Sequence, residues 1–169
     1  VNVQTGPVMA GVSWFKVTIH GKGGHGAIPN EAVDPIVCAA QMTMALQTIV
    51  ARNANPLEAA VLSIAQIHAG TVSNAIPDYA EMKGTYRIYT EAMRDLITKR
   101  FTEIVEHTAA AMGCTVDIEM RHAGLPVKDN AAVVKQVSAT GEKLGKKEDF
   151  LYKRAMASED VGLFMDDIP

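Results

Sequence analysis

The spacing of apolar residues alternates along this chain between the period of a strand and the period of a helix. Apolar and polar residues alternate over about 12–20, and a helical spacing follows from Asp34-Pro35, an N-cap followed by proline at the first helical position. Strand patterns recur near 61–68 and 79–86, a helical spacing covers about 91–112, and a last strand pattern lies near 115–121. The predicted order is strand, helix, strand, strand, helix, strand.

This order is typical of the split βαβ arrangement. We predict an α+β fold, a two-layer ferredoxin-like sandwich with a four-stranded antiparallel sheet and both helices on one face. The other face is left open, so it is either polar or covered by a partner. A third helix over 131–144, a charged loop over 145–149 and a last segment from Ala155 form a C-terminal helical tail. We divide the chain into 1–11, 12–124 and 125–169.

Apolar residues at intervals of three and four indicate the faces of the two main helices that meet the sheet. The second helix is expected to end at Gly113, because glycine commonly closes a helix. The expected core positions are Ile36, Val37, Ala40, Met44 and Ala45 in the first helix and Met93, Leu96, Ile97, Phe101, Ile104, Val105, Thr108 and Met112 in the second.

Composition excludes several classes of partner. The net charge is −3 and the basic residues are scattered, so we expect no binding to nucleic acid or to anionic lipid. No apolar run approaches the roughly 18 residues of a membrane span, and no basic-then-apolar leader opens the chain, so we expect no membrane contact and a cytoplasmic location. The chain begins without Met and stops at Pro169, and we expect it to be part of a longer protein.

Two cysteines, Cys38 and Cys114, lie in a helical pattern and at the start of a strand pattern. They have no metal-type spacing. We interpret them as reduced core residues, with a disulfide between them as the alternative.

The glycine-rich segment Gly21–Pro29 separates the first strand pattern from the first helix and contains His25. A phosphate-binding loop is the first alternative, but it fits poorly because His25, Pro29 and further residues stand between the glycines and the helix. Glycines at positive φ would instead present the imidazole at the tip of a turn, where it could polarise a carbonyl or hold an oxyanion. His25 is therefore our candidate catalytic residue, with a plain solvated loop histidine as the alternative.

A second polar cluster lies between the two middle strand patterns. Asn74 in the turn and Arg87 at the end of the next strand are suitable partners for a carboxylate or an oxyanion. A turn-capping Asn and a surface Arg are equally good interpretations. The other histidines have structural or solvated roles in our interpretation. Zinc-site spacings and serine or cysteine nucleophile motifs are absent from the sequence, so we predict no metal site in this chain and no covalent catalysis.

Several short motifs occur together and in order. They are Gly6-Pro7-Val8-Met9-Ala10, Gly21-Lys22-Gly23-Gly24-His25-Gly26-Ala27 with Pro29, Val33-Asp34-Pro35, Asn74 with Ile76-Pro77-Asp78, Gly84-Thr85-Tyr86-Arg87 and Ser158-Glu159-Asp160. With these motifs the chain resembles the di-metal aminoacylase and carboxypeptidase family, in particular its hippurate hydrolase, indole-acetyl-amino-acid hydrolase and N-acyl-L-amino-acid amidohydrolase branch.

The resemblance implies a specific role for the chain. In that family the β-α-β-β-α-β unit is inserted into a catalytic domain, acts as a lid and pairs with its twin in a homodimer. Residues 12–124 would be this lid and dimerisation domain, 1–11 a linker and 125–169 part of the catalytic domain. The parent enzyme would hydrolyse N-acyl or N-aroyl amino acids with two divalent metal ions, zinc, manganese or similar, held outside this chain. We expect the fragment to bind no metal and to be inactive alone.

The resemblance also implies roles for single residues. His25 would reach the active site of the partner subunit and stabilise the developing oxyanion, and Asn74 and Arg87 would lie near it and hold the substrate. Glu159 is a possible site residue, although a helix start with Ser158 as its cap is an alternative. Two departures affect substrate details: Asn30 replaces a second histidine, and Ala69-Gly70 replaces a Gly-Gly pair.

A different class of function remains as the alternative. Ferredoxin-like folds also occur as stand-alone modules that bind a small ligand or another protein through the open sheet face, without chemistry. An open reading frame that continues in both directions favours the lid, whereas start and stop codons at the two ends favour the module.

Overall fold

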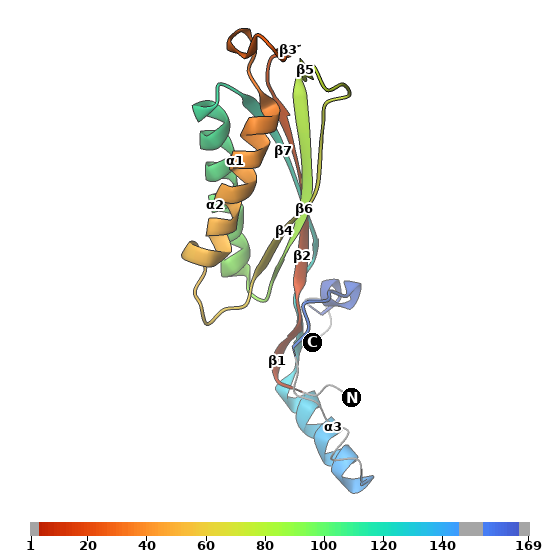
Figure 1. The fold of residues 1–169 in the computed structure, drawn as a ribbon. Coiled ribbons are helices and arrows are strands. Elements are labelled where there is room, and N and C mark those ends of the chain that lie inside the picture. Colours follow the sequence, from red (N-terminus) through yellow and green to blue (C-terminus); the bar gives the residue numbers. More distant parts are fainter. Residues whose placement is uncertain (1–3, 146–153, 166–169) are drawn as a thin grey trace.

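The computed structural model describes residues 4–145 and 154–165. Its main sheet has four antiparallel strands in the order β4-β6-β2-β7, and two long helices cover one face of it (Figure 1). Helix α1 connects β2 to β4, and α2 connects β6 to β7, so the predicted split βαβ sandwich is confirmed. The elements are β2 (Gly11–His20), α1 (Pro35–Thr48), β4 (Val61–Ala69), β6 (Tyr79–Ile88), α2 (Glu91–Ala111) and β7 (Thr115–Gly124).

Local signals set the ends of both helices. The Asp34 carboxylate accepts hydrogen bonds from the backbone N–H groups of Ile36 (2.8 Å) and Val37 (3.3 Å) at the start of α1. Thr90 caps α2 in the same way by accepting from the N–H of Met93 at 3.2 Å, and Gly113, with φ of +73°, follows its last turn. A π-helical turn, Ile49–Asn53, continues α1.

The core lies between the sheet and the two helices. Helix α2 buries most of the face that its periodicity predicts, including Ile97, Phe101 and Val105. Met112 was also expected in the core, but it follows the last helical residue and is exposed. The predicted face of α1 is wrong. Ile36, Val37 and Met44 are exposed, because α1 is apolar around most of its circumference and periodicity alone does not select the side that meets the sheet. The residues that α1 buries are Pro35, Cys38, Ala39, Met42 and Leu46.

The face of the sheet away from the helices is polar. Lys16 lies 3.0 Å from Glu119 and 3.3 Å from Glu81, and Lys83 lies 2.8 Å from Glu81. These charges come from neighbouring strands and form a cross-strand network on a solvated surface. The open face is therefore compatible with water.

Each end of the sheet carries an additional two-stranded ribbon. At one end β3 (Gly24–His25) pairs with β5 (Ala75–Ile76), and a 3₁₀ turn, Pro29–Glu31, follows β3. At the opposite end β1 (Gly6–Met9) pairs with β8 (Val127–Asp129) (Figure 1). These strands were missed in the sequence because two to four residues are too few to show a period.

The predicted tail lies beyond β8. Helix α3 (Ala131–Lys143) matches the expected helix, and Asn130 caps it by accepting from the N–H of Ala132 at 2.8 Å. A short 3₁₀ helix, Asp160–Leu163, lies beside β7 and β8. Apart from Gly145, the predicted charged loop lies outside the described residues, as do residues 166–169. The proposed divisions at 11/12 and 124/125 remain a prediction.

Two further expectations concern the cysteines and membranes. Cys38 and Cys114 are both buried members of the core and are free thiols, as the leading interpretation predicts. Within the described residues no helix has the length and the apolar character that crossing a bilayer requires.

Candidate functional site

The segment that carries His25 is held by backbone hydrogen bonds on both sides. The N–H of Gly21 donates to the carbonyl of Asp78 at 2.8 Å, and the N–H of Gly23 donates to the Asp78 side chain at 2.9 Å. The N–H of Gly26 donates to the carbonyl of Asn74 at 2.8 Å. These bonds connect the segment to the chain that runs into β6, so His25 is presented from a fixed support.

The glycines around His25 serve close packing rather than positive φ. None of Gly21, Gly23, Gly24 and Gly26 has positive φ, so that part of our prediction is wrong. A Cβ atom at Gly23 would lie 2.9 Å from Asp78 Oδ1, and one at Gly26 would lie 3.1 Å from the carbonyl oxygen of Asn74. Glycine is needed here because the two ribbon strands and their flanking turns approach each other too closely for a side chain.

The imidazole of His25 is exposed and has a defined hydrogen-bonding polarity. Its Nδ1 atom accepts a hydrogen bond from the backbone N–H of Ala27 at 3.1 Å. In a neutral imidazole one ring nitrogen accepts and the other carries the proton, so the proton lies on Nε2. His25 can therefore donate a hydrogen bond from Nε2 to an oxygen atom of a ligand, which is the chemistry expected of an oxyanion stabiliser.

Asn74 lies next to His25, as the resemblance implies. The ribbon pairs His25 with Ala75, so Asn74 is adjacent to the paired position. The Asn74 side chain is exposed and makes no hydrogen bond to any residue of 4–145 or 154–165. It does not cap its own turn, and its amide is available to a ligand.

Arg87 lies at the other end of the sheet. It is separated from Tyr79, at the His25 end of β6, by eight residues of extended strand, which is about 26 Å at about 3.3 Å per residue. Within one chain Arg87 is therefore not brought near His25, because the two residues lie at opposite ends of the same sheet, and the expected proximity of the two residues stays a prediction for the dimer.

The tail supplies the partner of Arg87. The Arg87 guanidinium donates from Nη1 to Ser158 Oγ at 2.7 Å. Ser158 does not cap the 3₁₀ helix; Glu159 holds the N-cap position and makes no side-chain capping bond. The alternative for Ser158 is thus wrong. Glu159 follows directly after the residue that Arg87 contacts, at the same end of the sheet.

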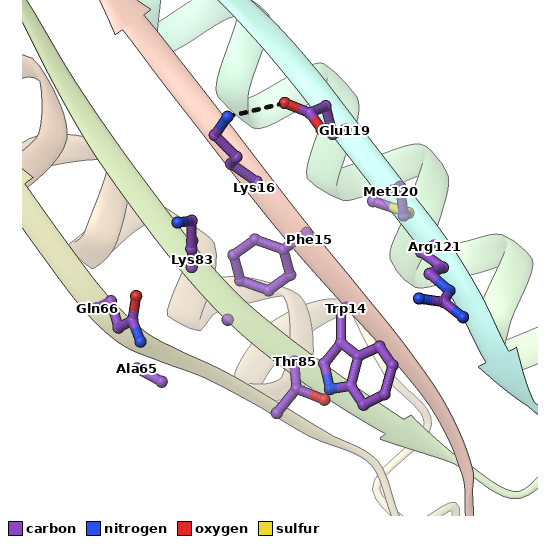
Figure 2. Close-up of a pocket in the computed structure, with 11 residues that line it drawn as sticks. Trp14, Phe15, Lys16, Ala65, Gln66, Lys83, Thr85, Glu119, Met120 and Arg121 are labelled. Carbon is purple, nitrogen blue, oxygen red and sulfur yellow. Dashed lines mark hydrogen bonds and ion pairs between the residues drawn. The ribbon is translucent and has the colours of Figure 1, made fainter.

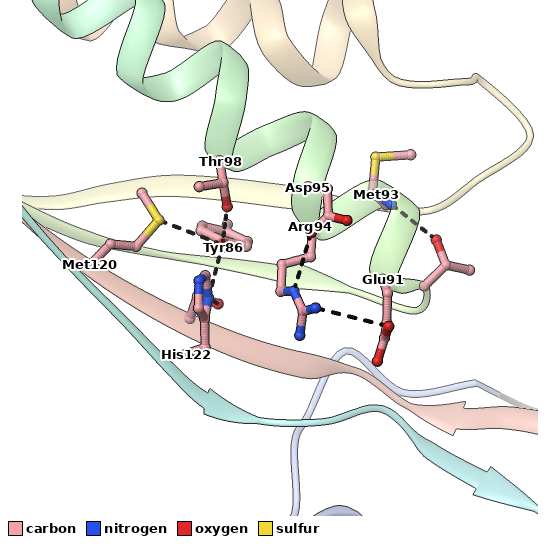
Figure 3. A network of polar contacts seen from close by, with 10 residues as sticks. Tyr86, Glu91, Met93, Arg94, Asp95, Thr98, Met120 and His122 are labelled. Carbon is pink, nitrogen blue, oxygen red and sulfur yellow. Dashed lines mark hydrogen bonds and ion pairs between the residues drawn. The ribbon is translucent and has the colours of Figure 1, made fainter.

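A third polar cluster was missed in the sequence. Ser13 Oγ lies 2.9 Å from Nδ1 of His122, and the hydroxyl of Tyr86 lies 3.3 Å from the same nitrogen and 2.9 Å from Thr98 Oγ1 (Figure 3). Ser13 is 2% exposed and lies in the core-facing row of β2, where no substrate could reach it. This serine–histidine contact therefore has a structural role. The sequence contains no local motif that predicts it.

The remaining histidines have protein partners or open surroundings. His20 Nε2 lies 2.8 Å from the Asp117 carboxylate, and His107 Nδ1 lies 2.6 Å from the Glu103 carbonyl. Within the described part of the chain, no group of three or more His, Cys, Asp or Glu residues is placed to hold a metal ion. The His, Cys, Asp and Glu side chains of the described residues are therefore not arranged as a di-metal centre requires.

The chain matches a known family model over residues 9–113, which is described as a peptidase dimerisation domain. It is 36% identical over 169 residues to an N-acetyl-L-cysteine deacetylase from Bacillus subtilis, covering 100% of this chain and 40% of that protein. It is 38% identical over 170 residues to an N-acetyldiaminopimelate deacetylase from Streptococcus thermophilus, covering 100% of this chain and 45% of that protein. The chain thus spans less than half of the length of these relatives.

Solved structures show the same fold. A protein from methicillin-resistant Staphylococcus aureus, described as an aminohydrolase, has a TM-score of 0.90 and 27% identity, with 99% of this chain and 44% of that chain covered. A dinuclear metal-binding peptidase from Bacillus subtilis has a TM-score of 0.80 and 28% identity, with 99% of this chain and 41% of that chain covered.

Proposed function

We propose a function on the premise that this chain belongs to the peptidase dimerisation domain family of the M20 hydrolases. The chain pairs two copies of a longer, metal-dependent amidohydrolase that cleaves N-acyl amino acids, and each copy supplies His25 to the active site of the other. The observation that carries this proposal is the separation of the candidate residues. His25 and Asn74 lie at one end of the sheet, and Arg87 lies at the other.

Strand β4 offers an edge for pairing. It lies at the end of the sheet order, and its only sheet partner among the described strands is β6. Its sequence, Val61–Ala69, contains no acidic residue, lysine, arginine or proline, the residues that usually protect an edge from pairing. A bulge at Ala65 divides the edge into two segments.

The exposed face of α1 extends this surface. Ile36 lies near the end of β4, because a Cβ atom at Gly70 would be 3.9 Å from Ile36 Cδ1. Ile67 of β4 pairs with the core residue Met82 and is therefore on the helix side of the sheet, yet it is 47% exposed. With Val37 and Met44 these residues form an apolar surface that a second copy of the chain would cover.

Pairing through β4 would also bring the separated site residues together, in the dimer instead of within one chain. A two-fold axis between two β4 edges makes the strands antiparallel, so the His25 end of one copy lies at the Arg87 end of the other. Strands β6 and β4 of one copy would then lie side by side with β4 and β6 of the other, with about 4.8 Å between neighbouring strands. His25 and Asn74 of one copy would join Arg87 and Glu159 of its twin in each of two equivalent sites.

The residues of this chain have limited roles in the reaction that we propose. The metal ions would be held by residues outside this chain and would supply the activated water. Nε2 of His25 would donate to the oxygen on which negative charge develops, and the Asn74 amide would support the same group. Arg87 would bind the substrate carboxylate, positioned by Ser158. The isolated chain would therefore be inactive.

The segments after β8 support the proposal that this chain is one part of a longer enzyme. Helix α3 exposes Val133 and Val137, and Leu144 directly after it is exposed as well. Leu163 at the end of the final 3₁₀ helix and Phe164 after it are also exposed. Apolar surfaces of this kind usually meet another part of the protein. Residues 125–169 would thus belong to the catalytic domain and 1–11 to the linker that leads from it. The family match favours this arrangement over a stand-alone binding module.

Complementation between subunits tests the proposal. Full-length enzyme with His25→Ala and full-length enzyme with Arg87→Ala are each expected to lose most activity. A mixed dimer of the two contains one site with both native residues, provided that His25 and Arg87 come from different subunits. Mixing should therefore restore activity, up to about half per mixed dimer.

The control is to mix the His25→Ala enzyme with an Asn74→Ala enzyme, because these residues come from the same subunit in our proposal. That mixture should show no recovery. Recovery in the control, or none with Arg87→Ala although mixed dimers form, would show that the residues are not shared in this way.

A further inference from the structure

A depression of about 540 Å³ lies on the open face of the sheet (Figure 2). Residues of all four strands line it, and neither His25 nor Arg87 is among them. Its volume is within the range of small-molecule sites. The argument for what it binds rests on Trp14, Lys16, Gln66, Lys83, Thr85 and Arg121.

Two rows of side chains form the walls of this depression. In one row Arg121, Trp14 and Thr85 are cross-strand neighbours. The other contains Lys16, Lys83 and Gln66, again aligned by the strand register. On β2 and β6 the rows are two residues apart, which is about 7 Å. The space between the two rows can therefore hold a flat ligand group that packs on the indole of Trp14.

Some of the cationic side chains around the depression have carboxylate partners, and one does not. Lys16 has carboxylate partners in Glu81 and Glu119, and Lys83 has one in Glu81. Arg121 has no carboxylate partner within residues 4–145 and 154–165, and the Gln66 side chain has no hydrogen-bond partner there. One cation and one amide thus face the depression with unused donors.

Trp14 adds an apolar surface next to that cation. It is 47% exposed, and the Arg121 guanidinium carbon lies 5.7 Å from its ring centroid. An exposed indole beside an unmatched guanidinium is a suitable surface for a ligand that is flat and apolar at one end and anionic at the other. The guanidinium can bind a carboxylate through two parallel hydrogen bonds.

We propose that this depression is a binding site for a small aromatic carboxylate, whose ring packs on Trp14 and whose carboxylate binds Arg121. The Gln66 amide and the Lys83 ammonium face the ring from the opposite row. The site does not depend on the proposed hydrolase function, because it uses none of the residues assigned to that reaction.

The test uses Trp14 as its own reporter, since it is the only tryptophan among the 169 residues. Benzoate is titrated into the chain while indole fluorescence is excited where the probe does not absorb. We expect a saturable change with a Kd of about 1 mM or tighter. Benzamide has the same shape without the charge and should bind at least about tenfold more weakly.

Substitutions locate the contact. Arg121→Gln should weaken benzoate binding about tenfold or more, because it removes the only unmatched cation of the depression. Arg154→Gln is the matched control, because Arg154 also lies over an aromatic ring, Tyr89 at 5.5 Å, but outside the depression. It should leave the affinity unchanged. Added salt should weaken benzoate binding to the native chain, a measurement that needs no variant.

Three results would overturn the proposal: no saturable response to benzoate, equal affinity for benzamide, or equal losses in the Arg121 and Arg154 variants. If cyclohexanecarboxylate bound as tightly as benzoate, the ring contact with Trp14 would be wrong as well. A response that appears only when the chain changes its oligomeric mass would assign this face to a second copy instead.

Discussion

His25 and Ala27 are joined by a hydrogen bond from the Ala27 backbone N–H to the imidazole Nδ1 at 3.1 Å. This contact orients the ring and places the proton of the neutral imidazole on Nε2, away from the protein backbone. The chain therefore presents a hydrogen-bond donor, rather than an acceptor, at the end of the sheet.

Replacing His25 by alanine should reduce kcat of the full-length enzyme about 10²–10³-fold, because one donor to the developing oxyanion is lost. The reduction should be larger in kcat than in KM, since the contact strengthens in the transition state. Steady-state kinetics measures both. His107→Ala on α2 is the control and should be near native. Native kcat in the His25 variant would rule out its catalytic role.

Replacing Ile67 by lysine should convert a dimer into a monomer, because the ammonium would be buried in the β4 interface without a partner. Light scattering after size exclusion gives the mass, first for the native chain, which we expect to be a dimer. Met112→Lys introduces the same charge at another exposed apolar position, at the end of α2. If Ile67→Lys stayed a dimer and Met112→Lys became a monomer, the interface would lie at the other edge of the sandwich and not at β4.

Replacing Gly84 by alanine should lower the free energy of unfolding by about 1–3 kcal/mol or more. The added Cβ would overlap the Ser63 carbonyl oxygen and the ring of Phe15, which is itself buried. Gly24→Ala is the comparison, since its Cβ would meet the Ala32 Cβ at 3.1 Å, a contact that a small shift can relieve. Denaturant unfolding should rank Gly84→Ala as clearly the more damaging; similar losses would contradict the packing argument.

The thiol of Cys38 should be unreactive in the folded chain. Burial, together with the neighbouring Cys114 thiol, raises the pKa of Cys38 from 9.0 to about 12. Because the folded pKa is the higher one, the unfolded chain loses this proton first, and stability should fall as the pH rises from about 9 to about 12. Ellman's reagent should label Cys38 only along the unfolding transition, and rapid labelling of the native chain would show that the thiol is accessible.

Much of this protein follows from local patterns in its sequence. Period-two and helical spacings, the caps at Asp34 and Thr90, and Gly113 after α2 are all effects of neighbouring residues, so they predicted the sandwich and the positions of its main elements. The glycines around His25 also marked the residue to examine, although the reason is close packing instead of positive φ.

Only the tertiary structure decided which of these residues act together. The β3–β5 ribbon brings His25 beside Asn74, while the length of β6 separates both from Arg87. Ser158 reaches Arg87 across 71 positions of sequence. The side of α1 that is buried was likewise undecided, because both of its faces are apolar. Strand register and long-range packing set these relationships, and neither leaves a local pattern that a sequence can display.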